Sequence, residues 1–111
     1  MDRSRVAVLY AHPLFGKGIA KLLSQDNRLD VSCKSANNED VVALVRGLLA
    51  DAVVLEGCDD PGLLAHLIAD LPPIPVTFVD LRGNAIVAYR ERRPVVPPPA
   101  TILDAVLPAS A

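Results

Sequence analysis

The chain lacks any long hydrophobic run, and this absence argues against a protein that crosses a membrane through helices. No stretch approaches the roughly 20 apolar residues that a membrane-spanning helix needs. No secretory signal is visible, because the first apolar run is short and follows Asp2, Arg3 and Arg5. We therefore expect a cytoplasmic protein without a membrane partner.

A surplus of positive charge is also missing. The 11 lysines and arginines are outnumbered by 13 acidic residues, and the net charge is −2. Nucleic-acid binding depends on neutralising phosphates, so it needs a positive surplus on some face. We expect any contact with nucleic acid to be indirect, through a partner.

Cysteine and histidine are scarce, with two of each. Cys33 and Cys58 lie far apart, in or beside predicted strands, which favours reduced thiols over a disulfide. These cysteines and histidines show none of the spacings that hold zinc. We expect neither a metal nor another cofactor.

Apolar residues are abundant, at 51% of the 111 residues. This length fits a single domain, residues 1–111, with one core. The high apolar content indicates strands buried on both faces and an apolar surface kept for a partner.

Strand and helix patterns alternate over the first 80 residues. Apolar runs predict strands, and helical spacing of apolar residues behind polar or proline starts predicts helices. The strands are expected at 5–10, 29–33, 52–55 and 75–79. The helices are expected at 13–26, at 37–50 with a start signal at 37–40, and at 60–71. This β-α alternation predicts a doubly wound parallel sheet.

The last third departs from that alternation. Residues 82–84 form a turn too short for a crossover helix, so residues 85–90 are expected to return antiparallel beside the fourth strand. The charged run 90–93 is interpreted as a solvated strand end, with a phosphate-binding patch as the alternative. A stiff proline-rich segment, 94–99, and a short helix, 100–107, follow. The expected fold is α/β and flavodoxin-like, with strand order 2-1-3-4-5 and an antiparallel last strand.

The first helix and its surroundings carry a family signature. Its motifs are His12-Pro13-Leu14-Phe15, Gly18-Ile19 and Leu22-Leu23, followed later by Asp51 to Glu56 and by Pro61-Gly62. In these motifs the chain resembles the receiver domains of two-component response regulators, in particular those with LuxR-type outputs. The resemblance covers residues 4 to 80.

The chemical positions of that family are altered here. The resemblance places the Mg²⁺-binding acids at Tyr10 and Ala11, the phosphoacceptor aspartate at Glu56, and a Thr or Ser at Asp80. Neither Tyr10 nor Ala11 supplies a carboxylate for Mg²⁺, and the extra methylene of Glu56 misplaces its carboxylate by about 1.5 Å. The resemblance therefore implies a degenerate pseudo-receiver that has lost its phosphorylation site.

Glu56 has two interpretations: a fixed mimic of the phosphorylated state or anchor for a charged partner, and a solvated or ion-paired acid at a strand end. We also predict an ion pair from Arg82 to Asp80 or Glu56 in place of the lost metal. Tyr10 is expected to pack as a lid over the old pocket. His12 is expected to bond the backbone through its ring.

The function expected from these features is regulatory and not enzymatic. A pseudo-receiver of this kind would act in signal transduction as a protein-interaction or dimerisation module, independently of aspartyl phosphorylation, with a protein partner or a second copy. The candidate interface residues lie in the last third: Val87, Tyr89, Arg90, Arg92, Ile102 and Val106. The first helix is a second candidate for this interface.

Two other functions are kept open. One is a small-molecule or anion sensor using the crevice of Tyr10, Ala11, Glu56, Asp80 and Arg82. The other, a divergent enzyme, ranks third because no nucleophile-base pair or metal cluster can be assembled from the sequence.

Overall fold

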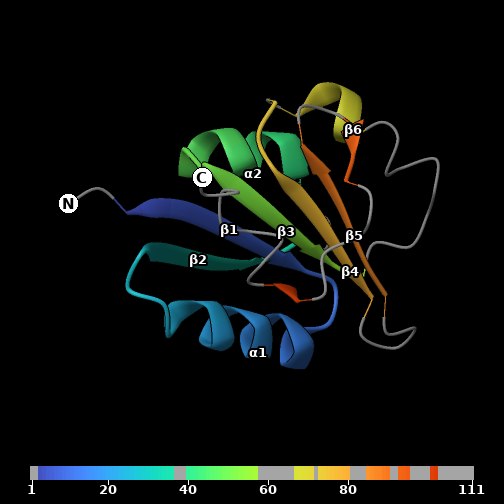
Figure 1. Cartoon of the computed structure of the whole chain (residues 1–111). Coiled ribbons are helices and arrows are strands. Elements are labelled where there is room, and N and C mark those ends of the chain that lie inside the picture. Colours follow the sequence, from blue (N-terminus) through green and yellow to red (C-terminus); the bar gives the residue numbers. More distant parts are fainter. Residues whose placement is uncertain are drawn as a thin grey trace.

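A computed structural model describes residues 3–36, 40–57, 67–71, 73–80, 85–90, 93–95 and 101–102 of the chain. The elements in chain order are β1 (Ser4–Tyr10), α1 (Pro13–Ser24), β2 (Leu29–Ser35), α2 (Val41–Leu48), β3 (Ala52–Glu56), β4 (Val76–Asp80), β5 (Ala85–Arg90) and β6 (Arg93–Pro94). They form an α/β fold around one mixed sheet (Figure 1).

The sheet has six strands in the order β2-β1-β3-β4-β5-β6. β1 runs parallel to both β2 and β3, and β3 runs parallel to β4. β5 is antiparallel to β4, as the short turn after residue 80 predicts. The sheet is compatible with a flavodoxin-like arrangement.

The predicted order, 2-1-3-4-5, was wrong because it lacked the sixth strand. Arg93–Pro94 pairs antiparallel with β5 and continues the sheet, although proline-rich sequence favours an unpaired extended segment. The Val95 N–H donates to the Ala88 carbonyl at 2.8 Å, which ties this segment to β5. Proline is tolerated there because β6 is an edge strand.

The two faces of the sheet carry separate apolar clusters. Ile19 and Leu23 of α1 pack with Val6, Val8 and Val54 on one face. On the other face, Val45 of α2 and Leu67 and Leu71 pack with residues from β1, β3 and β4. Figure 1 shows α1 on one side of the sheet and α2 on the other. All five residues of β3 are buried, which explains its unbroken apolar run.

Both described helices begin where their sequences predict. Pro13 occupies the first turn of α1, and the Asp40 side chain caps α2 by accepting a hydrogen bond from the Ala43 N–H at 3.2 Å. α2 is followed by its C-cap residue, Leu49, which has a left-handed backbone with φ 53° and an exposed side chain. Glycine is the usual residue at such a position, so Leu49 costs the helix some stability.

The turn between α1 and β2 is held by an exposed ion pair. Arg28 donates to both carboxylate oxygens of Asp26, at 2.9 and 2.6 Å. These hydrogen bonds lower the pKa of Asp26 from 3.8 to about 2. The stabilisation from this pair is therefore present above pH 4 and is lost as the pH falls through about 2.

Two predicted helices lie partly outside the described residues. Residues 67–70 of the third predicted helix are helical, and residues 60–66 are not described. Of the predicted terminal helix, 100–107, only Thr101 and Ile102 are described.

Candidate functional site

The candidate site lies where β1 and β3 end side by side. Their parallel register places Tyr10 opposite Glu56. The chain turns from β1 into α1 through Ala11 and His12, and it leaves β3 through Gly57. This is the edge at which ligands gather in open parallel sheets, and it is where the receiver resemblance places its chemistry.

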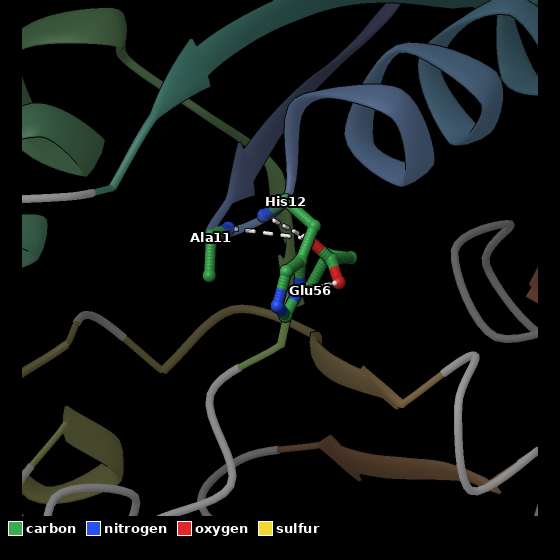
Figure 2. Close-up of polar contacts among 3 residues, drawn as sticks. All are labelled: Ala11, His12 and Glu56. Carbon is green, nitrogen blue, oxygen red and sulfur yellow. Dashed lines mark hydrogen bonds and ion pairs between the residues drawn. The ribbon is translucent and has the colours of Figure 1, made fainter.

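Glu56 is buried, with 1% of its surface exposed, and both carboxylate oxygens have hydrogen-bond partners within the chain. Oε1 accepts hydrogen bonds from the backbone N–H groups of Ala11, at 3.1 Å, and His12, at 2.8 Å. Oε2 lies 2.9 Å from Nδ1 of the His12 ring (Figure 2). A carboxylate is normally costly to bury, and these three contacts offset that cost.

We call this arrangement of Ala11, His12 and Glu56 the Glu56 clamp. It joins the turn after β1 to the end of β3 across 44 to 45 residues of sequence. The backbone adds to it, because the Ala11 N–H also donates to the Glu56 carbonyl at 3.0 Å. The carboxylate is thus an internal anchor and not a solvated acid.

Gly57 makes room for the His12 ring. Its backbone has φ +79°, and a Cβ there would lie 2.8 Å from His12 Nδ1 and 2.9 Å from the Ala11 Cβ. Glycine is needed both for the left-handed backbone and for this close approach. On its other side the His12 ring meets Phe15 edge-on, with centroids 5.8 Å apart.

The structure corrects the prediction for His12. Its ring bonds the Glu56 carboxylate, where the sequence predicted a bond to the backbone. The alternation of apolar and polar residues along the sequence cannot reveal this pairing. His12 and Glu56 come together only because β1 and β3 are neighbours in the sheet. The sequence held one signal for this pairing. His12 follows a buried strand directly, in a tight turn, and the parallel strand beside it ends in Glu56.

The Tyr10 side chain packs against α1. A Cβ on the buried Gly16 would overlap both the Cβ and the ring of Tyr10, so strand and helix meet there with no space to spare. In the described structure Tyr10 is therefore a contact between β1 and the first turn of α1. Its role as a lid over the strand ends stays a prediction.

Of the five residues predicted for the crevice, the structure brings Ala11 and Glu56 together, with Tyr10 beside them in register. Asp80 ends β4 and pairs with Ala85 of β5. Strand alternation places Asp80 on the face of Phe78, opposite to the face of Glu56. Arg82, and with it the predicted ion pair, lies outside the described residues.

These residues do not fit the Mg²⁺ that the receiver resemblance implies. Tyr10 and Ala11 offer no carboxylate, and both oxygens of Glu56 already accept hydrogen bonds within the chain. Mg²⁺ needs at least one carboxylate free to enter its octahedral shell. Across the described ranges, no three His, Cys, Asp or Glu side chains gather as metal ligands would.

The candidate interface residues divide between surface and core. Val87 on β5 is 43% exposed. Tyr89 is half-buried and packs edge-on against Phe78, with centroids 5.7 Å apart. Ile102 is buried in the α1-side cluster, so its side chain is not available to a partner. Arg90 is half-buried, and Arg92 and Val106 lie outside the described residues.

Other features of the described residues carry no evident chemistry. Burial raises the pKa of the half-buried Cys33 thiol, with nearby Lys17 acting in the opposite direction. A depression of about 250 Å³ lies along α2, lined by Asp40, Ala43, Leu44, Gly47 and Leu48. In the part of the chain that is described, no helix has the length and apolarity to cross a bilayer.

Comparison of the chain with protein-family models, with curated proteins and with solved structures found no match. The resemblance to receiver domains therefore rests on the motifs of the chain itself.

Proposed function

We propose that this domain is a cytoplasmic pseudo-receiver with a flavodoxin-like fold. It acts as a non-enzymatic interaction or dimerisation module in signal transduction, independently of aspartyl phosphorylation. The observation that carries the proposal is the Glu56 clamp. It stands where the resemblance places the phosphoacceptor, and both oxygens of its carboxylate are already bonded to groups of the same chain.

The clamp supports this function in two ways. A carboxylate must reach an incoming phosphoryl group to accept it, and Glu56 is 1% exposed. It must also be helped by a metal that neutralises charge, and the neighbouring positions hold Tyr10 and Ala11. The same burial counts against Glu56 as an anchor for a charged partner.

The test is incubation of the chain with acetyl phosphate and Mg²⁺, followed by intact-mass measurement. A phosphorylatable receiver domain treated in parallel shows that the reagents are active. The expected result is an unmodified mass for this chain. A stoichiometric phosphoryl adduct would overturn the proposal.

The sensor function is less well supported by the geometry. Its crevice would need Glu56 to face a ligand, and the Glu56 carboxylate is satisfied by Ala11 and His12. A thermal-shift screen against small anions separates the two functions. A ligand that raises Tm in the native chain, but not in a Glu56→Ala variant, would favour the sensor.

A further inference from the structure

β2 stands at one edge of the sheet, with β1 as its ladder partner among the described strands (Figure 1). It is seven residues long and contains neither proline nor glycine. Natural edge strands are usually shortened, bulged or interrupted, because an open edge is a template for another strand. β2 pairs with β1 without a bulge or a break from its first residue to its last.

The hydrogen-bonding groups of β2 alternate between β1 and the open side. The Ser4 N–H donates to the Arg28 carbonyl, and the Ala36 N–H donates to the Tyr10 carbonyl. Even-numbered residues of β2 therefore bond to β1. The N–H and C=O groups of Val31 and Cys33 consequently point outward, away from the sheet.

The side chains follow the same alternation. Val31 and Cys33 are half-buried on the α1 face, where they pack against the core. Asp30 and Lys34 are exposed on the opposite face, with Ser32 between them. Within the described residues, neither Asp30 nor Lys34 has an ion-pair partner.

We infer that β2 is the site at which a second copy of this chain docks, by antiparallel β2–β2 pairing about a two-fold axis at Ser32. This inference rests on the proposed function and names its partner and surface. The pairing continues one sheet through both copies, and a two-fold contact of this kind closes on itself.

Charge and hydrogen bonding select this register. A two-fold axis at Ser32 sets Asp30 opposite Lys34 of the second copy, twice, and sets Val31 opposite Cys33. The outward N–H and C=O groups of Val31 and Cys33 then bond to each other across the axis. Asp30 and Lys34 form pairs without ladder hydrogen bonds, where cross-strand side chains lie closest.

The neighbouring registers lack these features. An axis at Val31 sets Lys34 opposite Arg28, and an axis at Asp30 or Lys34 sets like charges against each other. An axis at Cys33 leaves Asp30 opposite Ala36. An axis that falls between two residues has a different fault. It places residues whose backbone N–H and C=O groups point outward opposite residues of the second copy whose groups already bond to β1. Among the symmetric registers, only the axis at Ser32 pairs opposite charges that both lie within β2.

The first experiment is sedimentation equilibrium of the chain from micromolar to sub-millimolar concentrations, with charge-reversed variants. A single ladder is smaller than a standard interface, so association should be reversible and concentration-dependent. Asp30→Lys and Lys34→Asp should each weaken dimerisation by about tenfold or more, because each places like charges opposite each other twice.

Two matched controls restore the pairing. The double variant Asp30→Lys/Lys34→Asp should dimerise like the native chain. An equimolar mixture of the two single variants should form a heterodimer with the affinity of the native dimer, although each variant alone dimerises more weakly. A native chain that stays monomeric throughout, or single variants that dimerise as well as it does, would overturn the inference. Circular dichroism confirms that each variant is folded.

A covalent test does not depend on charge. Antiparallel residues in a pair without hydrogen bonds have Cα atoms about 4.5 Å apart, within the range that a disulfide spans. In a Cys33→Val/Cys58→Ser background, Ser32→Cys should therefore oxidise to a covalent dimer. Val87→Cys, which changes an exposed side chain on β5, is the control. Cross-linking by the control but not by Ser32→Cys would overturn the inference.

The outcomes separate this inference from the proposed function. A monomeric chain that also resists acetyl phosphate removes β2 pairing and leaves a module that binds a different protein. A phosphoryl adduct removes the proposed function, whatever the oligomeric state.

Discussion

At the scale of single residues, Glu56 shows how a carboxylate at a strand end can serve the structure. A carboxylate at the end of a buried strand is a common place for chemistry, since neighbouring groups shift its properties. Here the extra methylene of glutamate lets it fold back onto Ala11 and His12. This carboxylate fastens the turn after β1 to the end of β3.

Removing this side chain should destabilise the domain. Glu56→Ala leaves two backbone N–H groups and the His12 ring without their acceptor, and we expect a loss of about 3 kcal/mol in the free energy of unfolding. Glu56→Gln keeps an oxygen that can accept from the N–H groups, so its loss should be about 1 kcal/mol. Urea denaturation measures both values.

Asp51 provides a matched control. It is exposed, and its carboxylate accepts a hydrogen bond from the Arg5 N–H at 2.9 Å. Asp51→Ala should cost about 1 kcal/mol or less, because water can replace the lost acceptor. Equal losses for Asp51→Ala and Glu56→Ala would mean that the clamp contributes no more than a surface contact.

At the scale of elements, α1 is fixed to the sheet by a glycine at its first turn. Gly16 is buried against Tyr10, whereas a Cβ on Gly18, two residues further on, would meet open space. The two glycines lie in the same helix, so their intrinsic helix propensities are the same. Only their surroundings differ.

This difference predicts opposite effects of one substitution. Gly16→Ala should destabilise the domain by about 2 kcal/mol or more, because the Tyr10 ring or the helix must move to admit the methyl group. Gly18→Ala should stabilise it by up to about 1 kcal/mol through helix propensity. Thermal unfolding followed by circular dichroism measures both, and a Gly16→Ala variant as stable as Gly18→Ala would contradict the close contact.

The elements also show how far sequence patterns reach. The starts of α1 and α2 follow from Pro13 and Asp40, whose chemistry acts within one helical turn. The apolar run of β3 predicts a central strand, and the short turn after β4 predicts the β4–β5 hairpin. β6 was not predictable, because Arg93–Pro94 pairs through tertiary contact with β5, which local propensity does not encode.

The location of the candidate site could be predicted from the sequence, but the contacts of its side chains could not. The sequence indicates that the ends of β1 and β3 lie together, and Tyr10 and Glu56 are in register there. It cannot indicate which way Glu56 turns, because that depends on the distance to Ala11 and His12 across the ladder. For this reason the contact between His12 and Glu56 could not be predicted from the sequence.

At the scale of the whole molecule, one sheet separates two apolar clusters. Ile19 and Leu23 belong to one cluster and Val45 to the other, while β1 and β3 contribute to both. Neither cluster can keep its shape without the strands that it shares with the other. We therefore expect the domain to unfold as a single cooperative unit.

The two tyrosines report on the two sides of this sheet. Tyr10 packs against α1, and Tyr89 packs with Phe78 on the opposite face, in a chain without tryptophan. Tyr10→Phe leaves Tyr89 as the only tyrosine probe, and Tyr89→Phe leaves Tyr10. In each variant, tyrosine fluorescence and far-UV circular dichroism should give the same urea midpoint. Separate midpoints would mean that one layer opens before the other.

The Glu56 clamp also has a consequence for the order in which the chain assembles. Its partners are 44 to 45 residues apart, so it closes only after β3 has docked beside β1. Contacts of such long range are slow to form, and those completed late act mainly on the rate of unfolding. The buried carboxylate should therefore lengthen the lifetime of the native state while leaving the speed of refolding nearly unchanged.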